Sequence, residues 1–250
     1  MGSIIRLNTV FNNTKLKVLQ DYNTDEIKSQ LLSLPTLRAF YDATDVSTMT
    51  MSSNIVTKLK DQSANQLHFV QSNTANAPTY NAQAFGHTGG LVFGGNHWLT
   101  ATNFFAGKQV GSIVVFAKGL SSELSIMLSS ESHVSIALYT RNGLVGGLNG
   151  GAIVKAIDAH IKPTNYVLAY NTTENKAQII LPYDCTTTSA NNGNTTINTS
   201  NALLGRWALN REDAKYIGNI GHVMMFDEDL SKNQAVLALV QEYAKRKYRV

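Results

Sequence analysis

The sequence predicts an all-β protein, a two-sheet antiparallel sandwich, and three observations support this fold class. Short apolar runs recur at roughly ten-residue spacing between residues 37 and 226, separated by Gly, Ser and Asn. No amphipathic helical pattern lies between these runs, which excludes a parallel α/β arrangement. The polar positions are supplied largely by 24 asparagines and 23 threonines, which favour turns and strands respectively.

The size, charge and cysteine content of the chain limit the classes of protein to which it can belong. A chain of 250 residues with 43% apolar residues can bury one sizeable core, so we expect a single sandwich. The net charge of +4 is concentrated in the last six residues, KRKYRV, which argues against a nucleic-acid partner. A lone cysteine, Cys185, cannot form an internal disulfide. No apolar run reaches the ~20 residues of a membrane span, and no signal-peptide pattern is visible, so we expect neither membrane insertion nor signal-directed secretion.

Residues 1–36 predict an arm with one short helix. Thr24 is expected as the N-cap, Asp25 and Glu26 favour the first turn, and Pro35 ends the helix. We interpret residues 1–36 as an anchoring or assembly segment. It would contact other proteins of an assembly, and we expect a homo-oligomer or a place in a symmetric particle.

The strands are expected in order along residues 37–226. The runs that predict them are NIVTKLKD, NQLHFVQ, GLVFGG, HWLTAT, VGSIVVFAKG, ELSIMLSS, HVSIALYT and KYIGNIGHVMMFD. The run NYVLAYNTTENKAQIILPY predicts a hairpin, because two apolar segments flank a polar tip. The glycine-rich residues 143–151 are expected as a hairpin loop, and residues 185–201 as a low-complexity loop.

A second helix is expected over residues 231–247. Ser231 followed three residues later by Gln234 fits a capping box. The last turn is basic, which suits the negative end of the helix dipole. The apolar face is formed by Val236, Leu237, Leu239, Val240, Tyr243 and Ala244.

Four segments carry a family pattern. YDATD at 41–45 opens the first strand, and KLKDQSANQLHFVQ follows with Leu59 and Ala64 where Trp and Gly are usual. APTY leads into GLVFGGNHWLT, where Gly95 and Asn96 replace an Asp-rich turn. YIGNIGHVMMFDEDLSKNQAVLALVQEYAKRKY closes the chain, with His222 in place of an acidic residue. In this order they resemble the laminin-G-like, concanavalin A-like jelly-roll domains of phage and bacterial surface proteins, over residues 37–250.

The resemblance implies a two-sheet jelly roll and, commonly, glycan binding, adhesion or a structural role in virions. Some relatives hold calcium, but the carboxylates that would line such a site are few here, and we expect no cofactor. Asp42 and Asp45 are expected to cap the turn into VSTMT. A calcium site at these two residues is the alternative interpretation.

The sequence lacks the patterns of an enzyme with this fold. A retaining glycosidase needs two carboxyl groups about 5–5.5 Å apart, which a sandwich supplies from alternate positions of one strand, as in E-x-D-x-x-E. That triplet is absent, as are G-x-S-x-G and the His and Cys spacings of a zinc site. We therefore expect no catalytic residue.

Four side chains are candidate glycan contacts. Trp98, Tyr139 and Trp207 could stack on sugar rings, and Asn96 could exchange hydrogen bonds with hydroxyls. Each aromatic residue also suits a place in the core, so the two interpretations stay open. The sequence thus predicts a non-enzymatic virion protein of a phage, a capsid decoration, head fibre or tail component that displays a lectin-like domain after assembly in the host cytoplasm. The alternatives are a carbohydrate-binding module of a bacterial surface protein, which would bind a cell-surface glycan, and a divergent glycoside hydrolase.

Overall fold

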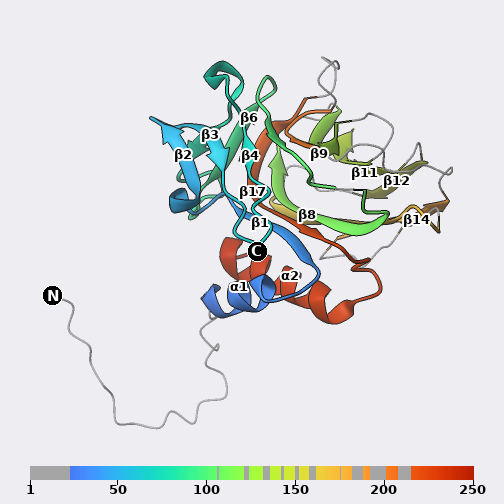
Figure 1. The fold of residues 1–250 in the computed structure, drawn as a ribbon. Coiled ribbons are helices and arrows are strands. Elements are labelled where there is room, and N and C mark those ends of the chain that lie inside the picture. Colours follow the sequence, from blue (N-terminus) through green and yellow to red (C-terminus); the bar gives the residue numbers. More distant parts are fainter. Residues whose placement is uncertain are drawn as a thin grey trace, which may run out of the picture.

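One antiparallel sheet curls over into two facing layers, and two helices lie together on the outside of one layer (Figure 1). The structure is a computed structural model. It describes residues 23–105, 107–120, 124–131, 136–141, 144–149, 152–157, 162–174, 176–181, 188–191, 201–207 and 215–250. The architecture confirms the expected all-β jelly-roll sandwich.

The first layer is built around a long strand, β17, which pairs with β8 along one edge and with β1 and β6 along the other. From β8 the layer continues through β13 and β14 to β15. Its strands are β1 (Leu37–Asp42), β6 (Gly90–Gly94), β8 (Val110–Gly119), β13 (Thr164–Asn171), β14 (Lys176–Ile180), β15 (Thr188–Asn191) and β17 (Ile217–Phe226).

The second layer runs in the order β4, β7, β16, β9, β10, β11, β12. Its strands are β4 (Phe69–Val70), β7 (Leu99–Ala101), β9 (Ser125–Ser130), β10 (Ile136–Arg141), β11 (Leu144–Asn149), β12 (Ala152–Ile157) and β16 (Ala202–Leu204). Three further strands join the layers: β2 (Met49–Ser52), β3 (Ile55–Leu59) and β5 (Thr79–Asn81). Because β3 pairs with both β4 and β5, the sheet folds over at this strand.

The strand β8 shows why the sequence of a central strand of the first layer is an almost unbroken run of apolar residues. Ile113, Val115 and Ala117 point into the core between the layers, whereas Val114 and Phe116 point outward and pack under the helices. Successive side chains of a strand alternate between faces, so a strand buried on both faces needs an unbroken apolar run. The sandwich therefore has an inter-layer core and a second, smaller core beneath the helices.

The helix α1 (Asp25–Leu32) lies close to the range expected from the sequence. Its first turn is capped by the side chain of Asn23, whose Oδ1 accepts the Asp25 N–H at 2.9 Å, and Thr24 makes no side-chain cap. Ile27 and Leu31 are buried against the outer face of the first layer. This helix therefore packs on the sandwich. The anchoring role of residues 1–36 stays a prediction, and residues 1–22 of that range lie outside the described residues.

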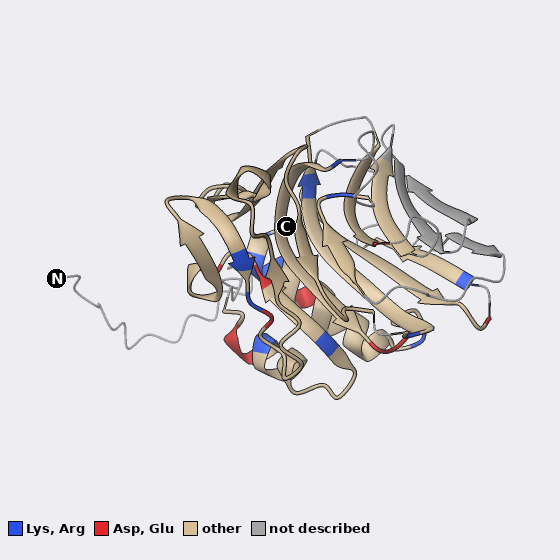
Figure 2. Cartoon of the chain, turned by 45° about the horizontal axis from the view of Figure 1, so that its top comes forward, with Lys and Arg blue, Asp and Glu red and all other residues tan. Residues whose placement is uncertain are grey.

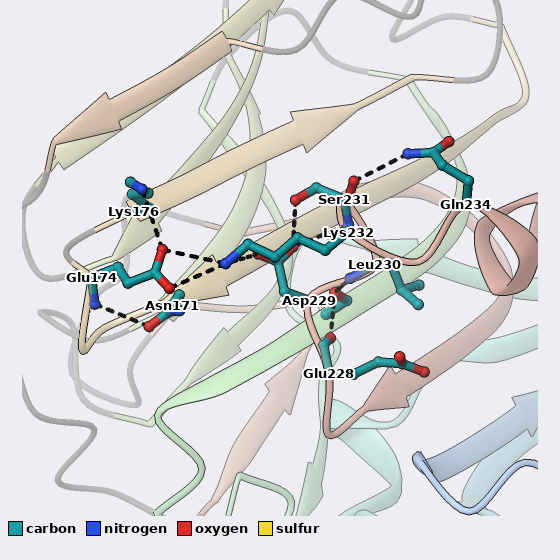
Figure 3. Close-up of polar contacts among 10 residues, drawn as sticks. Asn171, Glu174, Lys176, Glu228, Asp229, Leu230, Ser231, Lys232 and Gln234 are labelled. Carbon is teal, nitrogen blue, oxygen red and sulfur yellow. Dashed lines mark hydrogen bonds and ion pairs between the residues drawn. The ribbon is translucent and has the colours of Figure 1, made fainter.

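The helix α2 (Gln234–Tyr248) buries the predicted apolar face but begins three residues later than expected. Its N-cap is Asn233, whose Oδ1 accepts the Val236 N–H at 3.3 Å. Ser231 was expected there. Instead, its N–H and hydroxyl both donate to Asp229, at 3.0 and 2.6 Å, which holds the chain in a turn before the helix (Figure 3). The predicted capping box is therefore wrong. In the part of the chain that the structure describes, no helix has the length and hydropathy needed to cross a bilayer.

Replacing Asn233 with alanine is expected to reduce the free energy of unfolding by about 1 kcal/mol, because the first turn of α2 loses its cap. The loss should appear as a lower urea midpoint with an unchanged m-value. The matched variant Ser231→Ala should cost less, since its hydroxyl serves only the preceding turn. A larger loss for Ser231→Ala than for Asn233→Ala would contradict this assignment.

The loop predictions were partly wrong. The glycine-rich residues 143–151 contain β11, which pairs with β10 and β12. Pairing along both edges outweighs the low strand propensity of glycine. The expected loop at 185–201 contains β15, which pairs with β14. Cys185 itself lies outside the described residues. The predicted β13–β14 hairpin is confirmed, with Asn171 opposite Lys176.

Asp61 explains why the run NQLHFVQ yields only the short β4. Its Oδ1 accepts the N–H groups of Phe40 and Ser63, both at 2.9 Å, and its Oδ2 accepts the Leu67 N–H at 2.9 Å. These bonds fold the segment after β3 into a compact loop fastened to β1. The aspartate of the family-like motif KLKDQSAN is thus a structural residue.

Candidate functional site

Trp98 lies on the outer face of the second layer, the face that carries no described helix. It directly precedes β7, in which Leu99 and Ala101 point into the inter-layer core. Because side chains alternate along the strand, Trp98 and Thr100 point outward. The Trp98 ring is half-buried. Part of the Trp98 side chain is therefore exposed to solvent.

Arg206 covers the Trp98 ring. Its guanidinium carbon lies 4.6 Å from the ring centroid, and the residue is only 7% exposed. Gly205, just before it, has a φ of +90°, and a Cβ at that position would lie 2.4 Å from the Phe93 ring. Only glycine fits this bend, which brings the chain from β16 past Phe93 to Trp98. The cation and the aromatic ring form a fixed pair on the surface.

Lys215 connects this pair to Asn96. Lys215 and Arg206 face each other in an isolated antiparallel bridge, so their backbones are adjacent. The Lys215 Nζ donates a hydrogen bond to Asn96 Oδ1 at 2.6 Å. Asn96 is exposed at the turn between β6 and β7. The exposed amide is thereby held by the Lys215 ammonium.

Trp207 directly follows Arg206 in the chain and packs with Tyr139. They belong to a small outer cluster with Ile126 and Leu124, separate from the inter-layer core. Tyr139 stands opposite Ile126 in the pairing of β10 with β9 and is almost fully buried. Trp207 is half-buried. Tyr139 therefore acts mainly as packing, whereas Trp207 has a face toward solvent.

Two of the four residues selected from the sequence are thus linked, because Asn96 contacts Lys215, Trp98 contacts Arg206, and Arg206 pairs with Lys215. The other two, Tyr139 and Trp207, belong to the separate outer cluster, which adjoins the first pair where Trp207 follows Arg206 in the chain. We call the set the Trp98 platform, and it consists of Asn96, Trp98, Tyr139, Arg206, Trp207 and Lys215. Arg206 and Lys215 were missed by the sequence reasoning. Arg206 adjoins Trp207 in the sequence, but adjacency alone does not reveal that it stacks on Trp98, more than 100 residues earlier.

His97 adds no charge beside the platform. Its Nδ1 accepts the Gly94 N–H at 3.0 Å. Burial lowers the pKa of His97, so the ring is neutral at pH 7. The charge of the platform at neutral pH is therefore that of Arg206 and Lys215.

Asp42 and Asp45 have separate roles, and Asp42 is buried beneath α2. Its Oδ2 accepts hydrogen bonds from the Tyr243 hydroxyl and the Lys247 ammonium, both at 3.0 Å. Its Oδ1 accepts the Thr44 N–H at 3.0 Å and the Thr44 hydroxyl at 2.6 Å. Asp45 Oδ1 accepts the N–H of Ser47 at 3.0 Å and so caps the short turn after β1.

The charge balance at Asp42 explains its protonation state. Burial raises the pKa of the Asp42 carboxyl, but the Lys247 ammonium and the Thr44 hydrogen bonds outweigh burial and hold it below its usual value. A lysine already occupies the position where a cation would bind Asp42. The calcium interpretation of Asp42 and Asp45 stays a prediction. Among the described residues, no group of three His, Cys, Asp or Glu side chains could hold a metal ion.

Asp42 is the first member of a row that crosses four strands. Asp42 on β1 stands opposite His222 on β17, His222 opposite Phe116 on β8, and Phe116 opposite Asn165 on β13. The His222 Nε2 lies 3.1 Å from Asn165 Oδ1. Tyr248 of α2 stacks on Phe116, with ring centroids 3.5 Å apart and planes inclined by 8°. The C-terminal end of α2 packs on this row.

The row from Asp42 to Phe116 is covered by α2, so a ligand cannot reach it from solvent. His222 is fully buried, and burial lowers its pKa to about 3, although Asp42 acts in the opposite direction. Its ring contacts Phe116, Tyr243 and Tyr248. His222, which stands where the family pattern has an acidic residue, therefore packs beneath α2.

A second polar cluster fastens the β13–β14 hairpin to the chain before α2 (Figure 3). Glu174 Oε2 lies 3.2 Å from Lys176 Nζ, and Glu174 Oε1 lies 3.1 Å from Lys232 Nζ. These hydrogen-bonded lysines lower the pKa of the exposed Glu174. Each charge is paired within the cluster, as is typical of surface ion pairs. Elsewhere charged residues are sparse on the strands (Figure 2).

No protein-family model matches the sequence, and no curated protein does either. Solved structures do match. Domain 4 of AbnA, a GH43 extracellular arabinanase from Geobacillus stearothermophilus, solved in complex with arabinotriose, has a TM-score of 0.57 at 11% identity, covering 84% of this chain and 98% of that domain. Trypanosoma rangeli sialidase in complex with sialic acid has a TM-score of 0.57 at 13% identity, covering 87% of this chain.

Botulinum neurotoxin type C, described as dependent for cell entry on two ganglioside molecules, matches with a TM-score of 0.55 at 10% identity and 86% coverage of this chain. The match spans only 37% of the sialidase chain and 53% of the toxin chain. At these identities the matches show the fold alone. The chain therefore has the jelly-roll sandwich fold of these structures.

Proposed function

We propose that this chain is a non-enzymatic glycan-binding module whose ligand stacks on the Trp98 platform. The single observation that carries the proposal is the half-buried Trp98 ring, fixed by the Arg206 guanidinium 4.6 Å from its centroid; the exposed Asn96 stands two residues before it in the chain. Sugar rings bind through stacking on such aromatic faces together with hydrogen bonds from amides. Similar structures that hold arabinotriose or sialic acid support the proposal by analogy of fold.

The positions of the carboxylates support a non-enzymatic role. Asp42 holds α2, Asp61 organises a loop, and Asp227 pairs with Lys108 at 2.8 Å. A retaining glycosidase needs two carboxyl groups flanking one bond, about 5–5.5 Å apart. The residues that make up the Trp98 platform include no carboxylate. Release of reducing sugar by the purified protein would contradict this part of the proposal.

In its finer form, we propose that the module is displayed on a phage particle as a capsid decoration, head fibre or tail component. The proposal is supported by the order of the family-like motifs. Mass spectrometry of purified particles would test it. Absence of the protein from the particles would overturn the virion role and leave a free or cell-surface module.

Replacing Trp98 with alanine is expected to weaken glycan binding at least roughly tenfold, because stacking on the ring is lost. Binding would be measured by calorimetry with a ligand identified on a glycan array. The control is Val46→Ala, which also truncates an exposed apolar residue but lies next to Asp45, away from the platform. Equal affinities of wild type and the folded Trp98→Ala protein would overturn the site. No array ligand at millimolar concentration would overturn the function.

A further inference from the structure

A cavity of about 410 Å³ lies along one flank of α2, over the first layer and away from the Trp98 platform. We call it the α2 cavity. Its volume is within the range of sites that hold small molecules. Four of its helical residues are spaced by three or four positions and therefore share one flank of the helix. The described residues that line it are Asn165 of β13, Ala238, Gln241, Glu242, Ala244 and Lys245 of α2, and Val250.

Asn165 brings a buried hydrogen-bond donor to the α2 cavity. Its neighbour Tyr166 points into the inter-layer core, so Asn165 points outward from β13, toward the helix. The residue is only 2% exposed. Its Nδ2 is buried and has no hydrogen-bond partner within the described part of the chain. A buried donor without an acceptor is uncommon in folded proteins, so this amide requires an explanation.

The other end of the amide fixes the direction of this donor. Asn165 Oδ1 lies 3.1 Å from His222 Nε2, and His222 belongs to β17, on the far side of β8 from β13. His222 and the two tyrosines that contact it do not line the α2 cavity, so the cavity lies on the side of Asn165 away from His222. The oxygen and nitrogen of an amide diverge, and Nδ2 is therefore turned toward the cavity.

The rest of the described lining favours an uncharged ligand with an apolar part. Glu242 and Lys245 contribute one charge of each sign, and Glu242 is already engaged, because its Oε1 accepts a hydrogen bond from Arg246 Nε at 2.7 Å. Ala238 and Ala244 offer methyl groups as apolar contacts. The half-buried Gln241 carries an amide, which can both donate to and accept from hydroxyl groups.

We infer that the α2 cavity binds the acetamido group of an N-acetylated amino sugar. The acetamido carbonyl oxygen accepts the Asn165 Nδ2–H, the methyl group contacts Ala238 and Ala244, and Gln241 exchanges hydrogen bonds with the ring hydroxyls. A hydroxyl group alone could accept the same N–H, but it has no apolar part to place against the alanines. This second site is separate from the Trp98 platform and goes beyond the proposed function.

The test follows the side-chain amide signals of Asn165 by two-dimensional ¹H–¹⁵N NMR of the full chain. The chain is titrated with N-acetylglucosamine and, separately, with glucose, which carries a hydroxyl in place of the acetamido group. We expect the Asn165 signals to shift to saturation with N-acetylglucosamine and to stay in place with glucose. Equal shifts with both sugars, or no shift with N-acetylglucosamine, would overturn the inference.

Two variants that enlarge an exposed alanine of α2 form a matched pair. Ala238→Leu places a larger side chain in the cavity wall and should weaken binding of N-acetylglucosamine at least roughly tenfold. Ala235→Leu makes the same change outside the described lining and should leave the affinity unchanged. Equal affinities of the two variants would contradict the site.

Asn165→Leu removes the amide at similar side-chain volume and should abolish the difference between the two sugars. If that variant does not fold, the pair of alanine variants keeps the inference falsifiable. The outcome is independent of the proposed function, which is decided by the glycan array and by Trp98→Ala. A shift confined to the Trp98 indole signal would support the proposed function and overturn this inference.

Discussion

Replacing Asp42 with alanine is expected to reduce the free energy of unfolding by about 3–5 kcal/mol, the range observed when one partner of a buried ion pair is removed. The carboxylate is fully buried and accepts hydrogen bonds from Thr44, Tyr243 and Lys247. Without it, the Tyr243 hydroxyl and the Lys247 ammonium lose their partner beneath α2. Urea unfolding followed by circular dichroism would measure the loss.

Asp45→Ala is the matched control, because Asp45 lies in the same segment but caps only the short turn after β1. It should cost about 1 kcal/mol. A double-mutant cycle with Lys247→Met would isolate the ion pair, and the combined loss should be smaller than the sum of the single losses. Equal losses for Asp42→Ala and Asp45→Ala would show that Asp42 does not anchor the helix.

The second large effect is a loss of stability in mild acid that depends on His222. Its pKa in the folded protein is about 3, against 6.5 for an ordinary histidine. As pH falls, the His222 side chain of the unfolded chain is therefore protonated near pH 6.5, whereas that of the folded protein is protonated only near pH 3. The stabilisation is complete above pH 6.5 and is lost as pH falls through this window, at about 1.4 kcal/mol per pH unit. At pH 5 the loss attributable to His222 is about 2 kcal/mol.

The variant His222→Gln tests this linkage, because glutamine keeps an amide that can contact Asn165 but does not titrate. Its stability at pH 7 will be lower than that of wild type, but its pH dependence between 6.5 and 4 should be flatter. His68 and His97, whose pKa values are also lowered, titrate in both proteins and cancel in the comparison. Parallel stability curves for the two proteins would contradict the assignment to His222.

Much of the fold could be predicted because it depends on local patterns. The alternation of β8, the β13–β14 hairpin and the apolar face of α2 are all visible in the sequence. The errors arose where a contact from elsewhere decides the local structure. Ser231 donates its hydrogen bonds to Asp229 and does not cap α2, so the helix begins later than predicted. The glycine-rich segment forms β11 because it pairs with β10 and β12.

The candidate site was predictable only in part. Aromatic and amide residues could be selected by type. The structure links Trp98 and Asn96 through Arg206 and Lys215, whereas Tyr139 and Trp207 pack in a separate outer cluster. Their organising residues, Arg206 and Lys215, could not be selected, because their contacts with Trp98 and Asn96 join segments that are more than 100 residues apart in the sequence. The two aspartates beside Tyr41 look equivalent in the sequence. Their different roles depend on a helix about 200 residues later, which covers one of them.

The neighbouring positions of α1 and α2 have a consequence for how this domain can be joined to others. The Arg246 guanidinium of α2 lies 3.4 Å from the carbonyl oxygen of Asn23, so the described chain starts and finishes on the same side of the sandwich. The Trp98 platform is on the outer face of the opposite layer. A protein fused before Asn23 or after α2 would therefore leave the Trp98 platform unobstructed. The domain is suited to insertion within a longer chain, because both connections, before Asn23 and after α2, lie on the side away from the Trp98 platform.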